Sequence, residues 1–125
     1  MDLERFRSYC LALEGVSEKM PFGRFAARYD SVLAFYVSGH MFCFVDIDDF
    51  TFVDVKSSPD GIAELQARYV SWDRPLNRSL RYWIRIRFGG DVADETVCAL
   101  VARAYDLVKA QYARPPRLRK RRDGA

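Results

Sequence analysis

Residues 31–56, SVLAFYVSGHMFCFVDIDDFTFVDVK, decide the fold. They contain three runs of apolar, β-branched and aromatic residues, 31–38, 41–47 and 51–56, and this composition is typical of β-strands. Gly39-His40 between the first two runs is a two-residue hairpin signal. Because connections this short make neighbouring strands antiparallel, the stretch predicts three consecutive strands of an antiparallel sheet.

Helical patterns lie on both sides of these strands. The first helix is predicted from apolar residues spaced by three and four, with Asp2 as its N-cap: Leu3, Phe6, Cys10 and Leu13. A second helix is predicted to begin at Ser58, because Pro59 then takes the first helical position. A third helix is predicted over residues 91–112, where apolar residues keep a period of 3.6.

One more strand completes the expected sheet. Residues 82–88, YWIRIRF, alternate so that Trp83, Arg85 and Arg87 share one face. The short stretch 25–29 adds a possible edge segment. This order of elements predicts the α+β class, with two layers: an antiparallel sheet of about five strands, and three helices packed on one of its faces.

The length and composition indicate one folded domain. The chain has 125 residues, among them 9 Phe, 7 Tyr and 2 Trp, which excludes a disordered protein. The longest apolar run, residues 32–37, is far shorter than the ~18 residues of a membrane span. Acidic residues within the first 25 positions argue against a signal peptide. We therefore expect a cytoplasmic domain over residues 1–113 with no membrane partner.

The net charge of +3 is unevenly distributed. Residues 114–125 hold six basic residues and one Asp, so the first 113 residues carry a net charge of −2. We expect this tail to be disordered. Its cations are Arg114, Arg117, Arg119, Lys120, Arg121 and Arg122. Such a run binds polyanions without sequence preference, and the alternative is a tail that only confers solubility.

Few residues in the chain suit metal, cofactor or catalytic chemistry. Three cysteines, Cys10, Cys43 and Cys98, lie on predicted apolar faces without CxxC spacing, and we interpret them as buried free thiols. His40 is the single histidine, so no metal site and no Ser/His or Cys/His catalytic arrangement is expected. Glycine-rich phosphate loops are also absent from the sequence. We expect no cofactor and no enzymatic activity.

Several segments between about residues 3 and 110 resemble the MmcQ/YjbR family. They are GHMFCFVD at 39–46, KSSPD at 56–60, Asn77 with Trp83, GDVADE at 90–95 and AYDLV at 104–108. The resemblance implies a two-layer fold similar to secretion chaperones and to frataxin-like (CyaY-like) proteins. It also implies DNA binding, by analogy with a "double wing" surface of a phage transcription factor. His40 stands where the family has a hairpin lysine, and Arg78 keeps the basic residue after Asn77.

The strongest local feature is a run of arginines with no acidic residue between Arg74 and Gly90. It comprises Arg74, Arg78, Arg81, Arg85 and Arg87. Guanidinium groups pair with phosphates, and an exposed Trp83 could stack on an unpaired base. The predicted nucleic-acid-binding residues are this run with Lys56, Asn77 and Trp83, and in the tail Arg117, Arg119, Lys120, Arg121 and Arg122. Alternatively, Arg85 and Arg87 pair across the sheet with Asp46, Asp48, Asp49 or Asp54, and Trp83 covers a sheet face.

Two functions from different classes follow. The first is weak, largely sequence-nonspecific binding of nucleic acid, with DNA as the implied partner. The second is a protein-interaction or chaperone-like module, alone or as a homodimer. Phe42, Phe44 and Phe52 are expected on one strand face, where aromatic residues more often form core than a binding surface. If the second face of the sheet is uncovered, its aromatic residues would hold the partner and the arginines would be structural. Ionic strength separates the two, because phosphate contacts weaken steeply with salt and apolar contacts do not.

Overall fold

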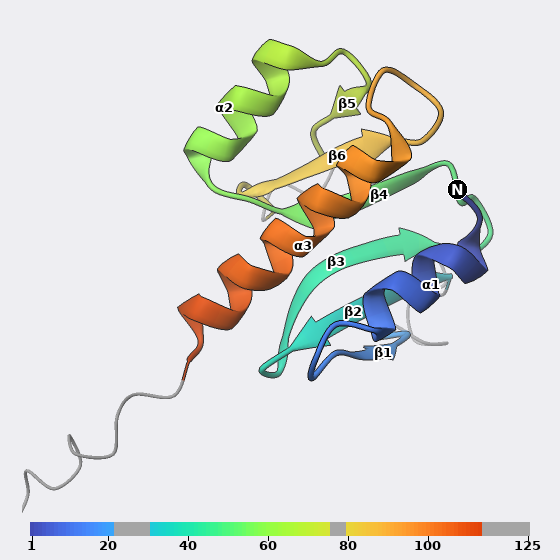
Figure 1. The fold of residues 1–125 in the computed structure, drawn as a ribbon, viewed down its shortest axis with the longest axis vertical. Helices are drawn as coiled ribbons and strands as arrows, with labels where there is room; N and C mark the ends of the chain where they lie inside the picture. The colour runs from blue at the N-terminus through green and yellow to red at the C-terminus, as the bar shows by residue number, and fades with distance from the viewer. Residues whose placement is uncertain (22–30, 76–79, 114–125) are drawn as a thin grey trace, which may run out of the picture.

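The computed structural model describes residues 1–21, 31–75 and 80–113 and shows three helices and six strands there (Figure 1). In chain order they are α1 (Leu3–Leu11), β1 (Ser17–Lys19), β2 (Val32–Val37), β3 (His40–Asp46), β4 (Phe52–Lys56), α2 (Pro59–Arg68), β5 (Trp72–Asp73), β6 (Trp83–Arg87) and α3 (Asp94–Gln111). The strands form one antiparallel sheet in the order β1-β2-β3-β4-β6-β5. The predicted α+β class is confirmed, with six strands rather than about five.

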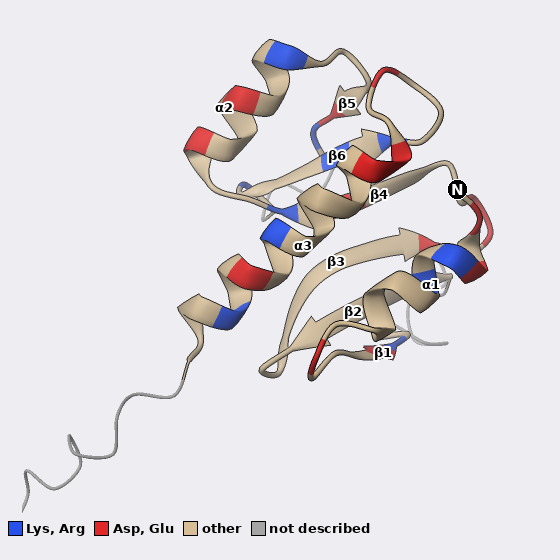
Figure 2. Ribbon diagram, viewed as in Figure 1, with Lys and Arg blue, Asp and Glu red and all other residues tan. Residues whose placement is uncertain are grey.

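The first two helices begin at the predicted caps. The Asp2 carboxylate accepts a hydrogen bond from the Arg5 backbone N–H at 2.8 Å, and the Ser58 hydroxyl accepts one from the Gly61 N–H at 3.0 Å. Each bond satisfies a donor that the helix itself leaves unpaired. Acidic and basic positions are interspersed along the helices (Figure 2). None of the helices in the described ranges is both long and apolar enough to cross a lipid bilayer.

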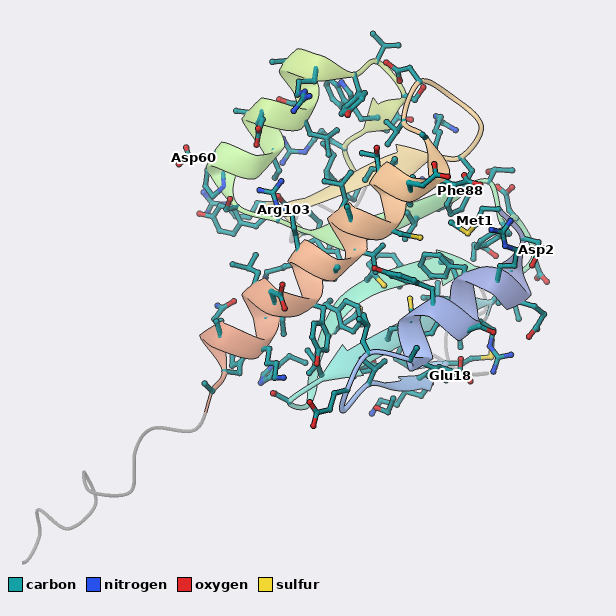
Figure 3. The ribbon with its side chains drawn as sticks, in the orientation of Figure 1. Met1, Asp2, Glu18, Asp60, Phe88 and Arg103 are labelled. Carbon is teal, nitrogen blue, oxygen red and sulfur yellow. The ribbon has the colours of Figure 1, made fainter. Side chains whose placement is uncertain are left out.

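Strands β1 and β5 form the two edges of the sheet and account for the difference in strand number. They have three and two residues, too few to show a period of two in the sequence. Strand β1 is held to α1 by an ion pair of Glu18 with Arg7, and Figure 3 shows Glu18 close to that helix. This ion pair lowers the pKa of the Glu18 carboxyl. The expected edge segment at 25–29 lies outside the described residues.

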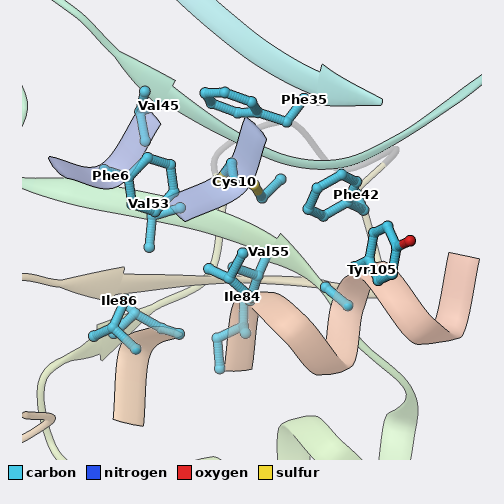
Figure 4. Packing of buried hydrophobic residues seen from close by; sticks show 14 of the residues in the cluster. Phe6, Cys10, Phe35, Phe42, Val45, Val53, Val55, Ile84, Ile86 and Tyr105 are labelled. Carbon is cyan, nitrogen blue, oxygen red and sulfur yellow. The ribbon is translucent and has the colours of Figure 1, made fainter. Parts of the chain in front are cut away.

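All three helices cover the same face of the sheet, and the hydrophobic core lies between the helices and that face. Phe6 and Cys10 of α1 are completely buried there, and α2 contributes Ile62 and Leu65. Strands β4 and β6 present Val53, Val55, Ile84 and Ile86 to the same layer (Figure 4). The opposite face of the sheet carries the alternate residues of every strand, and we refer to it as the helix-free face.

The β2–β3 hairpin turns one residue earlier than its sequence predicts. The last strand pair is Val37 with His40, so the two turn residues are Ser38 and Gly39, with φ of 54° and 78°. Two consecutive positive φ values define a type I′ turn, whose twist matches that of the strands. His40 therefore belongs to β3, where its exposed ring stacks on Tyr112 at a centroid distance of 3.4 Å.

Replacing Gly39 with Ala is expected to lower the free energy of unfolding by about 1–2 kcal/mol, because a Cβ is disfavoured at positive φ. Urea denaturation measures the loss. Gly39→Asn is the matched control, since Asn tolerates this conformation and should lose less. Equal losses in the two variants would contradict the turn assignment.

A β-bulge in β3 separates aromatic residues that the sequence groups together. Phe35 pairs with Cys43 and Tyr36 pairs with Met41, so Phe42 is the extra residue. As a result Phe42 and Cys43 are both buried in the core, and the Phe42 ring lies 5.6 Å from that of Tyr105 on α3. The expectation that Phe42 shares a face with Phe44 is therefore wrong.

Candidate nucleic-acid interface

The helix-free face combines charged and aromatic side chains. The strand register determines which side chains these are. They are Lys19 of β1, Tyr36 of β2, Phe44 and Asp46 of β3, Phe52, Asp54 and Lys56 of β4, Asp73 of β5, and Trp83, Arg85 and Arg87 of β6. Asp54 and Arg85 are direct neighbours near the middle of the sheet, with Phe44 on one side and Asp73 on the other. Most of the residues that the sequence assigns to nucleic-acid binding and that the structure describes lie on this face or at its border.

Asp54 and Arg85 form a bidentate ion pair. Arg85 Nε donates to Asp54 Oδ1 at 2.9 Å, and Nη2 donates to Oδ2 at 3.0 Å. The Asp54 side chain is 0 % exposed, and the Arg85 guanidinium lies 3.8 Å from the centroid of the Phe52 ring. Burial raises the pKa of the Asp54 carboxyl, although Arg85 opposes that shift. The predicted pairing of Arg85 with an aspartate across the sheet is therefore confirmed. Its guanidinium is already bound to the Asp54 carboxylate.

Arg87 is also paired, but with a partner that the sequence does not suggest. Its Nη2 contacts the carboxylate of Asp73 on β5, whereas the expected partners lay on or beside β3 and β4. Asp73 reaches Arg87 because the register sets Asp73 opposite Arg85, two positions away on the same face. Both side chains of this pair are about half exposed, at 53 % for Arg87 and 46 % for Asp73.

Trp83 contributes to packing on this face. It is 6 % exposed, and its ring centroid lies 5.2 Å from that of Phe44. The Lys56 ammonium is 5.8 Å from the centroid of the indole. The stacking role that requires an exposed indole does not fit this placement, whereas covering a sheet face does.

Three other predicted residues, Lys56, Arg74 and Arg81, lie at or just beyond neighbouring ends of β4, β5 and β6, and we call them the basic corner. Arg74 Nη2 donates to the carbonyl oxygen of Arg81 at 2.9 Å. The Ser57 N–H donates to the carbonyl oxygen of Tyr82 at 2.7 Å, which fastens the end of β4 to the start of β6. Among the described residues, no carboxylate lies within ion-pair distance of these three cations.

The other predicted residues are not placed. Asn77, Arg78, Arg117, Arg119, Lys120, Arg121 and Arg122 lie outside the described residues. Lys19 is not predicted from the sequence, yet its ammonium lies 4.7 Å from the centroid of the Tyr36 ring on the helix-free face. Only recognition of strand β1 could have placed Lys19 on this face, and β1 is too short to recognise from the sequence.

The thiols and carboxylates form no metal centre in the described parts of the chain. No group of three or more His, Cys, Asp or Glu side chains is suitably placed there. Cys10 and Cys43 are buried and Cys98 is partly buried, all as free thiols. Burial and the neighbouring Cys10 raise the pKa of the Cys43 thiol, so it stays protonated at neutral pH.

Comparisons with known proteins identify the family. The YjbR family model matches residues 11–107, which is most of the chain. The chain belongs to the YjbR family. This YjbR protein is similar to the crystal structure of Deinococcus radiodurans protein DR2400, which has a DUF419 domain. The identity is 26 % and the TM-score 0.72, over 86 % of this chain and 78 % of that one.

A second crystal structure shares the fold of this YjbR protein. It is a protein from Pseudomonas syringae, with 14 % identity and a TM-score of 0.66, over 86 % of this chain and 98 % of that one. No curated protein matches this chain.

Proposed function

We propose that this YjbR protein binds nucleic acid weakly and without strong sequence preference, through phosphate contacts, and that it acts as a binding protein rather than an enzyme. The observation that carries the proposal is the basic corner, whose three cations have no acidic partner among the described residues. The predicted DNA partner and the basic tail are part of the same proposal.

The ion pairs of the helix-free face support this position for the contact. Asp54 and Asp73 are each neutralised by an arginine of β6, so they do not cancel the charge of the corner. Arg74 is held by its bond to the Arg81 carbonyl, which orients its guanidinium and leaves N–H groups for a phosphate. The Lys56 ammonium supplies a third positive charge at the end of β4, beside Trp83.

The test is fluorescence anisotropy with labelled duplex and single-stranded DNA at about 50 and 200 mM salt. Replacing Lys56, Arg74 and Arg81 together with Gln should weaken duplex binding. It should also make the slope of log K against log salt shallower, by about 0.9 for each phosphate that the variant no longer neutralises. A second variant with Gln at the six basic positions of the tail measures the contribution of residues 114–125.

The matched control replaces Arg5, Arg68 and Lys109 with Gln. These exposed cations lie on the three helices that cover the other face, so the net charge changes by the same amount. The control should bind almost as well as the unchanged chain. Equal weakening by both triple variants would mean that only total charge matters, and loss of binding with the tail variant alone would place the contact outside the domain.

A protein-interaction surface is the second candidate, because Tyr36, Phe44 and Phe52 are half-buried on a sheet face that no described helix covers. If neither DNA form binds, this candidate is favoured. Light scattering then tests for a homodimer, which should persist at high salt if apolar contacts hold it together.

A further inference from the structure

A groove runs between α2 and α3 on the helix-covered face of the sheet, opposite the face that carries the Asp54–Arg85 and Asp73–Arg87 ion pairs. Its main cavity has a volume of about 360 Å³ and lies between the start of α2 and the middle of α3, and a second cavity of about 120 Å³ continues toward the end of α2. Gly61, Leu65, Leu100 and Arg103 line both cavities. In the view of Figure 1, β6 is visible between α2 and α3.

The lining of the main cavity combines an aliphatic part with a polar part of similar extent. Aliphatic side chains come from the strands below and from both helices: Val55, Ile84, Leu65, Leu100, Ala104 and Leu107. A cavity of this size lies within the range that proteins use for small ligands. The aliphatic part of the lining suits a hydrocarbon body.

Polar groups gather where the groove meets the start of α2. The Ser58 hydroxyl is used by the Gly61 N–H, whereas no hydrogen bond between described residues engages the Ser57 hydroxyl. A Cβ at residue 61 would lie 2.5 Å from the Ser57 hydroxyl, so the missing side chain of Gly61 makes room for it. Lys56 also lines the cavity, but its ammonium lies beside Trp83.

Arg103 supplies a positive charge to both cavities. Its guanidinium makes no ion pair with any carboxylate that the structure describes. Figure 3 shows Arg103 on the side of α3 that faces α2, whereas Asp60 points outward from α2. Two carboxylates, those of Asp106 and Glu64, also line the groove and oppose an anion. The start of α2 adds the positive end of its dipole near Arg103.

We propose that this groove binds an organic anion with an apolar body. The body lies on the aliphatic lining, and the anionic group meets Arg103 beside Ser57. The proposal is argued separately from nucleic-acid binding, because its anion contact is Arg103 on the helix-covered face. Lys56 borders both regions, but its ammonium lies beside Trp83.

Octanoate is the probe, titrated into the full chain at concentrations that keep it monomeric, with amide chemical shifts as the readout. Octan-1-ol and octylammonium, which also have an eight-carbon chain, are the uncharged and the cationic control compounds. Octanoate should shift amides of α2 and α3 and bind at least tenfold more tightly than octylammonium. Equal affinity for the two ions, or octanoate shifts confined to the helix-free face, would overturn the proposal.

Two substitutions at the groove test the charge of the ligand with opposite signs. Arg103→Gln should weaken octanoate binding about tenfold, and Asp106→Asn should strengthen it severalfold, while octan-1-ol binding stays the same in both. Leu100→Trp should fill the groove and remove binding of octanoate and octan-1-ol alike. If that variant does not fold, Leu107→Trp replaces it. An octanoate affinity unchanged by Arg103→Gln would overturn the assigned anion contact.

Discussion

Replacing Phe6 with Ala is expected to lower the free energy of unfolding by about 3–5 kcal/mol, the range for deleting a fully buried aromatic ring. Phe6 is 0 % exposed. Its ring centroid lies 5.7 Å from Phe35, 5.9 Å from Phe50 and 6.2 Å from Phe88, each in an edge-to-face arrangement. These rings belong to separate parts of the sheet layer, so the substitution leaves a cavity between α1 and the strands. Guanidinium denaturation followed by circular dichroism measures the loss.

Leu11→Ala is the matched control for this substitution. Leu11 ends the same helix but is 39 % exposed, so its truncation removes less buried surface and should cost less than about 1 kcal/mol. Phe6→Leu should fall between the two, because it keeps part of the apolar volume. Similar losses for Phe6→Ala and Leu11→Ala would mean that α1 is not anchored through Phe6.

The sequence predicts elements whose signals are local. Asp2 and Ser58 cap the helices they precede, and both bonds involve residues only three positions apart. The four strands predicted within the described residues are found because each is long enough to show strand composition. The bulge at Phe42 could not be predicted, because nothing in residues 40–46 shows that β3 has one residue more than its partner.

The candidate site depends more on register than on local pattern. Alternation places Trp83 and Arg85 on one face, but whether Trp83 is exposed depends on Phe44, which comes from another strand. The Asp73–Arg87 pair was missed because β5 is only two residues long. Arg74 follows β5 and Arg81 precedes β6, and the sequence does not show that the two residues lie close together. The hydrogen bond from the Arg74 guanidinium to the Arg81 carbonyl is seen only in the structure.

Replacing Arg85 with Leu is expected to lower the free energy of unfolding by about 3 kcal/mol at pH 7, because it leaves the Asp54 carboxylate buried without its partner. The loss should be smaller at pH 5. Burial already raises the pKa of Asp54 in the folded chain, and removing Arg85 takes away the group that opposes the shift. The folded variant therefore takes up a proton at a pH where the unfolded chain, with an ordinary pKa of about 3.9, does not.

Two further variants separate this effect from a general loss of charge. Arg87→Leu removes an arginine from the same strand and face, but its pair with Asp73 is half exposed and should be worth less than about 1 kcal/mol. Replacing Asp54 and Arg85 together with Leu removes both members of the buried pair and should recover most of the lost stability. Denaturant titrations at pH 5 and pH 7 measure all three variants.

A loss in Arg85→Leu that is the same at both pH values would show that Asp54 is not the group responsible. The arginine at position 85 would then stabilise the sheet through its contact with the Phe52 ring, which lies 3.8 Å from the guanidinium and does not titrate.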